Sequence, residues 1–121
     1  MSEFLQIALK SYTDTRGTLT VAQDDIPFKI KRCYWITEAN SQVRGGHRHH
    51  VTRQFLVAIR GEVHIYMNDG VKDAEIILNN PSVGLLVEPE DWHTMHFQTG
   101  AILLVISSHD YDPSDYIDEK Y

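Results

Sequence analysis

The chain has 121 residues, of which 42% are apolar and 23% charged, and its formal net charge is −6 with neutral histidines. This length predicts one globular domain over residues 1–121, which can remove roughly two-thirds of its unfolded surface from water. The acidic balance argues against a general nucleic-acid binder, and no apolar run reaches the ~20 residues that span a membrane.

Cysteine usage and the first residues predict the compartment. Cys33 is the single cysteine, which excludes an internal disulfide and a multi-cysteine zinc site. The opening sequence MSEFLQIALK is too short and too polar for a signal peptide. We therefore expect a cytoplasmic protein that binds neither nucleic acid nor a membrane.

Short β-like runs separated by turn residues dominate the chain. The predicted strands cover residues 4–9, 18–22, 28–36, 54–59, 62–67, 74–78, 84–88, 93–97 and 101–107. Turn sequences such as RG, NDG, NNPS, PED and QTG separate the later ones. Short strands at this regular spacing predict an all-β antiparallel sandwich or barrel. Only the segment after Asp112 suits a short helix, with Pro113 near its start.

Two of the predicted strands are apolar on both faces, QFLVAI over residues 54–59 and AILLVIS over residues 101–107. One face of each must point into the core. The other face also has to be covered, by a second sheet or by a second subunit. This pattern favours a homodimer.

Three histidines stand within four residues: His47, His49 and His50. Side chains two residues apart in a strand point to the same side, so His47 and His49 share one face. Arg48 and His50 share the opposite face. Gln54 follows five residues after His49, which gives the pattern H-x-H-x(4)-Q.

This pattern, with a glycine seven residues after the glutamine, resembles the first motif of the cupin barrels. The cupin motif usually has a glutamate where this chain has glutamine. The second cupin motif is a glycine, a proline and a histidine, which GLLVEPEDWH supplies as Gly84, Pro89 and His93. The resemblance implies a cupin-type jelly-roll β-barrel of antiparallel strands. Four polar side chains then converge on its interior: His47, His49, Gln54 and His93.

Spacing alone leaves three interpretations of this cluster open. Three neutral imidazoles can bind a divalent metal, although Gln54 supplies no charge to offset the cation. An imidazole can instead take a proton from carbon next to a carbonyl and return it, because it titrates near neutral pH. The third interpretation is that these side chains are satisfied polar residues lining the mouth of a barrel.

Four segments resemble the dTDP-sugar 3,4-ketoisomerases, which are also described as WxcM-like proteins. They are DTRGTLTVAQDDIPFKIKRCYWI, RGGHRHHVTRQFLVAIRGEV, NPSVGLLVEPEDWHTM and YDPSDYI, in that order over nearly the whole chain. The resemblance implies conversion of dTDP-4-keto-6-deoxy-D-glucose into a 3-keto sugar, in the biosynthesis of amino deoxysugars of lipopolysaccharides or antibiotics. It also implies catalysis without a metal or other cofactor, and a homodimer in which N-terminal strands can be exchanged.

The resemblance further implies roles for individual residues. The family's base is the second histidine of the H-x-H pair, which is His49, and His47 would move a proton between the sugar oxygens. His93 would bind or polarise the sugar. Arg44 is our candidate for the pyrophosphate. The donor that stabilises the enediolate is either His47 or a tyrosine such as Tyr34, our candidate catalytic tyrosine.

Four more residues are candidates for substrate binding, each with a competing structural interpretation. Gln54 would orient the ligand or a histidine by hydrogen bonding. Arg16 lies in a DTRG turn and Arg32 in a strand, so each contacts a phosphate or only stabilises the fold. Trp92 stacks on the thymine base or packs in the core or an interface.

Two rival functions accompany the ketoisomerase hypothesis. One is a small metal-dependent cupin enzyme, such as a dioxygenase or isomerase. The other is a nucleotide-sugar-binding module without catalysis. The sequence leaves open whether the product has the galacto or the gluco configuration at C4, because that depends on which face of the enediolate receives the proton.

Overall fold

The computed structural model describes residues 2–121, so the first residue of the predicted domain 1–121 lies outside the described part. Nearly all of its regular structure is β-strand. The strands are β1 (Gln6–Ala8), β2 (Lys10–Asp14), β3 (Gly17–Val21), β4 (Arg32–Ile36), β5 (Val43–His49), β6 (Gln54–Arg60), β7 (Val63–Asn68), β8 (Asp73–Leu78), β9 (Val83–Val87), β10 (Trp92–Phe97), β11 (Ile102–Ser107) and β12 (Tyr116–Ile117).

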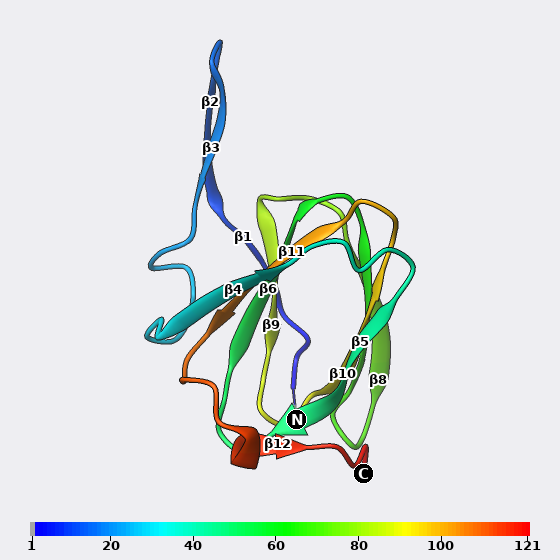
Figure 1. The fold of residues 1–121 in the computed structure, drawn as a ribbon. Coiled ribbons are helices and arrows are strands. Elements are labelled where there is room, and N and C mark those ends of the chain that lie inside the picture. Colours follow the sequence, from blue (N-terminus) through cyan, green and yellow to red (C-terminus); the bar gives the residue numbers. More distant parts are fainter. Residues whose placement is uncertain (1) are drawn as a thin grey trace.

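Two five-stranded antiparallel sheets face each other and form a barrel (Figure 1). One sheet has the order β1-β9-β6-β11-β4 and the other β12-β5-β10-β7-β8. Most neighbouring strands are far apart in sequence, as expected when consecutive strands alternate between two packed sheets. The predicted all-β jelly-roll fold is confirmed.

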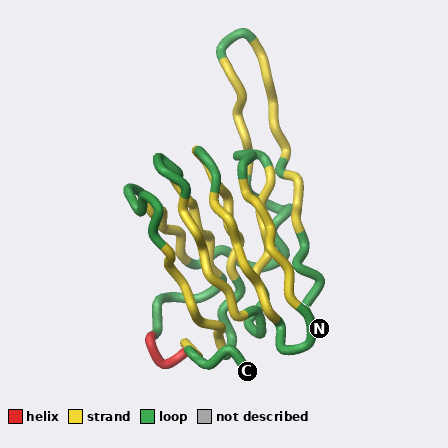
Figure 2. Tube along the Cα trace, turned by 90° about the vertical axis from the view of Figure 1, so that its right-hand side faces the viewer, coloured by secondary structure: helices red, strands yellow, loops and turns green. Residues whose placement is uncertain are grey.

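Strands β2 and β3 form a separate hairpin that extends away from the barrel (Figures 1 and 2). All five residues of β2 are exposed. The sequence analysis missed β2 because its residues, KSYTD, are polar and show no apolar face.

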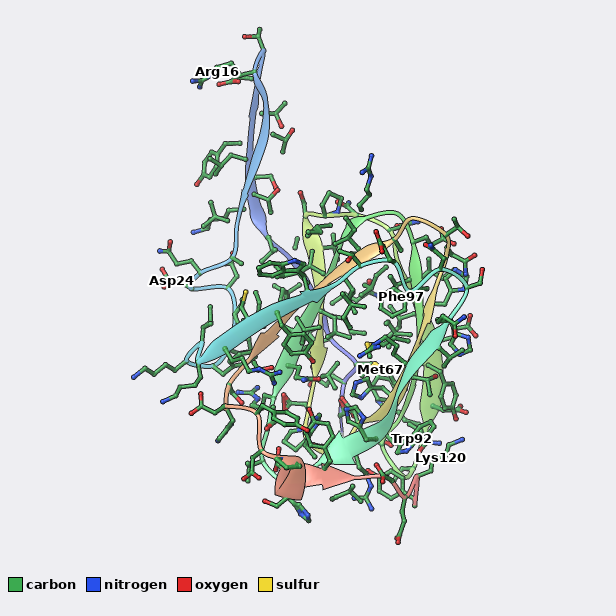
Figure 3. All side chains as sticks on the ribbon, viewed as in Figure 1. Arg16, Asp24, Met67, Trp92, Phe97 and Lys120 are labelled. Atoms are coloured by element: carbon green, nitrogen blue, oxygen red, sulfur yellow. The ribbon has the colours of Figure 1, made fainter. Side chains whose placement is uncertain are left out.

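The core lies between the two sheets. In β6, Leu56 and Ala58 point inward and are fully buried, while Phe55 and Val57 point to the outer face. Met67 and Phe97 fill the interior from the opposite sheet (Figure 3). Packed apolar side chains therefore occupy most of the barrel interior.

The outer face of β6 and β11 is partly covered by the same chain. Phe55, Val57 and Ile106 form a second buried cluster with Leu9 and Ile26. The apolar pattern of these strands predicted that a second sheet or a second subunit covers this face. Residues from the N-terminal part of the chain supply much of it instead.

Two predicted elements differ from the structure. The strand expected over residues 28–36 is reduced to β4, because residues before Arg32 belong to the segment that covers the outer face. The helix expected after Asp112 is a single 3₁₀ turn, Pro113–Asp115, followed directly by β12 (Figure 2). The Asp112 carboxylate caps this turn by accepting from the Ser114 N–H at 3.0 Å.

Gly84 allows the outer cluster to pack, since a Cβ at this position would overlap the ring of Phe55. We expect Gly84→Ala to lower the free energy of unfolding by about 1–3 kcal/mol through overpacking. Urea unfolding of the single variant and of Gly84→Ala/Phe55→Leu measures this. The smaller leucine should recover part of the loss, and equal stability of Gly84→Ala and wild type would contradict the packing argument.

Candidate functional site

Three imidazoles meet inside one end of the barrel. His47 and His49 point inward from β5, and His93 points inward from β10, directly opposite His47 in the strand register. The ring centroid of His47 lies 5.0 Å from that of His49 and 5.2 Å from that of His93. The structure thus brings His93 together with His47 and His49, the pair predicted to share one strand face.

Glycine makes this close pairing of β5 with β10 possible. Gly45 has φ +89°, and a Cβ there would lie 2.8 Å from the backbone oxygen of His93. His93 pairs with His47 and Thr94 pairs with Gly45, so Gly46 is an extra residue in β5 and forms a β-bulge. The bulge changes the direction of the chain beside the histidines.

His93 is held in one tautomer. Its Nδ1 lies 3.0 Å from the backbone oxygen of Asp91, which can only accept, so Nδ1 carries the proton. Complete burial lowers the pKa of His93 to about 3. The ring is therefore neutral, and its Nε2 offers a lone pair to the barrel interior.

His49 is buried without a hydrogen-bond partner. Only 3% of its surface is exposed, and neither Nδ1 nor Nε2 has a partner within residues 2–121. Burial and the neighbouring His47 lower the pKa of His49 to about 4. Burial also lowers the pKa of the partly exposed His47, although Asp118 counteracts this. At neutral pH both rings are therefore neutral imidazoles, each with one nitrogen that can accept a proton.

Gln54 faces the same interior from the other sheet. It lies opposite Ser107 in the register, and its Nε2 donates to the Tyr34 hydroxyl at 3.4 Å. Burial raises the pKa of Tyr34 above its ordinary value, and Tyr116 adds to the shift. Tyr34 is therefore a neutral phenol that can donate a proton. The Ser107 hydroxyl is buried without a partner within the described residues.

Two arginines lie near Tyr34. The guanidinium of Arg32 sits 4.4 Å from the centroid of the Tyr34 ring and 5.3 Å from that of Tyr111. Arg32 and Arg44 both partly offset the raised pKa of Tyr34. These cations can bind an anionic group beside the histidines.

Tyr116 and Tyr111 complete the site, and the sequence analysis missed both. The ring centroid of Tyr116 lies 4.5 Å from that of His47 and 4.8 Å from that of His49. Tyr111 packs edge-on against Tyr116 at 5.8 Å. The segment YDPSDYI contains both tyrosines, but only the pairing of β12 with β5 shows that they reach the histidines.

Two predicted substrate-binding residues lie elsewhere in this chain. Arg16 is at the tip of the β2–β3 hairpin, paired with Asp14 and 88% exposed in its side chain (Figure 3). Trp92 lies on the outer face of β10, where its Nε1 donates to the Asp118 oxygen at 2.9 Å. Strand alternation turns Trp92 away from the face that carries His93.

The donor set fits a metal poorly. Within residues 2–121, no group of three His, Cys, Asp or Glu side chains has the arrangement to hold a metal ion. Gln54 brings no negative charge to the site. The chemistry that these residues support is proton transfer by neutral imidazoles next to a phenol and two guanidinium groups.

No helix within residues 2–121 has both the length and the apolar character needed to cross a bilayer.

Comparison with known proteins gives consistent matches over nearly the whole chain. A family model described as FdtA: WxcM-like, C-terminal matches residues 2–121. The TDP-4-oxo-6-deoxy-alpha-D-glucose-3,4-oxoisomerase of Aneurinibacillus thermoaerophilus is 39% identical over 115 residues, covering 92% of this chain and 83% of that protein.

Two solved structures have closely similar folds. A variant of the 3,4-ketoisomerase QdtA from Thermoanaerobacterium thermosaccharolyticum, in complex with TDP-4-keto-6-deoxyglucose, is 38% identical with a TM-score of 0.92. That match covers 98% of this chain and 90% of the other. The WlaRB TDP-quinovose 3,4-ketoisomerase from Campylobacter jejuni is 34% identical with a TM-score of 0.94, covering 98% and 95%.

The lowered pKa values of His49 and His93 predict how the stability of the protein depends on pH. In the folded protein His49 and His93 stay neutral down to about pH 4 and 3, whereas the unfolded histidines protonate near 6.5. Below pH 6.5 the unfolded state binds more protons, so these two histidines make stability fall as the pH drops from 6.5 towards 4. The raised pKa of Asp91, about 6 because of burial, opposes them only in part.

Histidine-ring NMR during an acid titration, with the protein in urea as the unfolded control, measures the pKa values directly. The signals of His49 and His93 should not titrate between pH 7 and 5 in the folded protein. A midpoint near 6.5 for His49 would contradict the proposed dry environment.

Proposed function

Because the chain belongs to the FdtA: WxcM-like, C-terminal family, we propose that it converts dTDP-4-keto-6-deoxy-D-glucose into a dTDP-3-keto-6-deoxyhexose. It is a sugar-nucleotide 3,4-ketoisomerase that transfers protons through an enediolate. The observation that carries the proposal is the buried imidazole of His49, which is neutral and has no hydrogen-bond partner for either nitrogen among residues 2–121. Such a ring can accept a proton from carbon.

The reaction needs two proton transfers at carbon and one between oxygens. His49 removes the proton from C3, which the neighbouring C4 ketone acidifies, and the electron pair forms an enediolate with negative charge on O4. A proton then moves from O3 to O4, the step assigned to His47. His49 returns its proton to C4 as the O3 electrons form the new ketone at C3, so no atom is gained or lost.

The enediolate oxygen needs a donor aimed at it. Tyr34 fits this role because burial keeps its phenol protonated and Gln54 restrains its hydroxyl at 3.4 Å. His93 presents an acceptor to the sugar through Nε2. Arg32 and Arg44, which lie near Tyr34, bind the pyrophosphate.

Experiments can distinguish the proposed function from the two alternatives, a metal-dependent enzyme and a binding module. A metal enzyme would lose activity on chelation, and a binding module would show no turnover at all. Proton transfer without a metal or cofactor is favoured because Gln54 stands where the cupins usually have an anionic ligand. The predicted cytoplasmic location and the absence of nucleic-acid and membrane partners stay predictions.

A homodimer suits the exposed apolar side chains. Tyr12 and Leu19 on the hairpin are 62% and 61% exposed, and Trp35 and Ile59 on the barrel are 64% and 45% exposed. A projecting hairpin with apolar side chains buries them if it packs on a second copy. If Arg16 binds substrate, exchange of hairpins would have to carry it to the partner's site, because it lies at the tip of the hairpin that projects from the barrel.

Replacing the base tests the catalytic role. We expect His49→Asn to lose about 10²–10⁴-fold in turnover of dTDP-4-keto-6-deoxyglucose and to retain TDP binding, because general-base catalysis typically contributes that much. NMR in D₂O follows deuterium entry at C3 and C4 and formation of the 3-keto product. His50→Asn is the matched control, since the exposed neighbouring side chain points away from the site.

Wild-type protein treated with EDTA should keep its turnover. Loss of turnover on chelation would favour the metal enzyme, and wild type without deuterium exchange or product would favour the binding module.

Mixed dimers test the exchange of hairpins. Arg16→Ala and His49→Asn should each be poorly active as homodimers. If Arg16 serves the partner's site, a mixture that exchanges subunits should contain one site with both native residues and regain up to about a quarter of wild-type turnover. That fraction assumes random pairing with one intact site in half of the dimers. No recovery in a mixture shown by mass spectrometry to hold mixed dimers would contradict the exchange.

A further inference from the structure

The C-terminal segment with β12 crosses one end of the barrel (Figure 1). Its Tyr116 contacts His47 and His49 there. Its strand β12 pairs antiparallel with the end of β5, which sets Tyr116 opposite His49 and Ile117 opposite Arg48. A segment almost seventy residues later in the chain thus lies directly beside the proposed base. The proton-transfer steps described above assign it no role.

Asp115 fixes this segment to the turn between β5 and β6. Its carboxylate accepts from the backbone N–H groups of His50, Val51 and Thr52 at 3.1, 2.9 and 3.3 Å, and from the Thr52 hydroxyl. The backbone oxygen of Asp115 accepts from the His50 N–H as well, at 3.0 Å. Burial would raise the pKa of Asp115, but these hydrogen bonds outweigh it and hold the pKa below its ordinary value.

The anchored segment places the ring of Tyr116 against two imidazoles. The Tyr116 ring meets His49 edge-on, at 70° between planes and 4.8 Å between centroids, and lies 4.5 Å from His47. Since neither nitrogen of His49 has a hydrogen-bond partner within residues 2–121, only packing fixes the rotation of this imidazole. Aromatic rings in edge-on contact restrict each other's orientation.

We propose that Tyr116 is a positioning residue for His49, whose ring holds the imidazole in its reactive orientation and keeps water from it. This inference rests on the proposed function, in which His49 is the base. It assigns the effect to the aromatic ring of Tyr116 and not to its hydroxyl.

Four side chains that carry ionisable groups lie around His49: His47 on β5, His93 on β10, Asp115 in the 3₁₀ turn, and Tyr116 on β12. Among these, His47 favours the neutral form of His49 and Asp115 favours the charged form. Burial is the largest effect, and the Tyr116 ring contributes to it. Loss of the ring should admit water and raise the pKa of His49 towards 6.5.

Substitutions that keep or remove the ring test the proposal. Tyr116→Phe should retain most of the wild-type kcat. Tyr116→Leu and Tyr116→Met should lose kcat on the order of 10- to 100-fold with little change in KM, because a misplaced base costs that much. Ile117→Ala, in the same strand but opposite Arg48, is the matched control and should behave as wild type.

Histidine-ring NMR supplies a readout that a loss of stability would not move. The midpoint for His49 should rise in the Leu and Met variants and stay low in the Phe variant, while thermal unfolding and the Kd for TDP report on folding and binding. Two variants without the aromatic ring are used. If one of them fails to fold, the other still tests the proposal. Wild-type kcat and an unchanged His49 midpoint in a folded ringless variant would overturn the proposal, as would a Phe variant that loses as much kcat as Leu.

The design also separates this inference from the proposed function. If wild type shows no isomerase turnover, the proposed function fails, and the NMR midpoints alone decide whether Tyr116 controls His49. If wild type turns over and the ringless variants match it in both kcat and midpoint, only the positioning role fails.

Discussion

The arrangement of the site depends on one imidazole that is kept dry and unpaired. In the described part of the chain, both ring nitrogens of His49 are buried without hydrogen-bond partners, which is unfavourable for polar atoms unless a ligand binds them. Burial lowers its pKa to about 4, so at neutral pH the ring is ready to accept a proton. The packing of the surrounding barrel offsets the free-energy cost of this desolvation.

The barrel interior has an apolar part, which forms the core, and a polar part, which forms the site. Leu56, Met67 and Phe97 are fully buried and hold the two sheets together. The same strands then present polar side chains at one end, where Gln54 on β6 precedes Leu56 and His93 on β10 precedes Met95 and Phe97. In each of these strands the apolar residues stabilise the barrel, and the neighbouring polar residue belongs to the site. The site is therefore held on rigid strands.

Side chains distant in sequence make the site more than a cluster of histidines. Gln54 restrains Tyr34 from one sheet, while Tyr116 reaches His47 and His49 from the C-terminal segment. Tyr116 also raises the pKa of Tyr34, after the larger effect of burial. Among the imidazoles, His47 lowers the pKa of both His49 and His93.

The sequence by itself determined the strand pattern, the antiparallel barrel and the shared face of His47 and His49, because period-two alternation is a local property of the chain. It also supplied the family resemblance through ordered segments such as GLLVEPEDWH. It missed the exposed strand β2, whose polar residues carry no apolar face, and it overestimated the strand before Arg32 and the helix after Asp112.

Only the tertiary structure decided which side chains surround the base. It turned Trp92 to the outer face of β10, placed Arg16 at the tip of a projecting hairpin, and brought Tyr116 against His49 through the pairing of β12 with β5. The physical reason is that register between strands far apart in the chain is set by packing across the whole barrel. No local pattern in the sequence encodes that pairing.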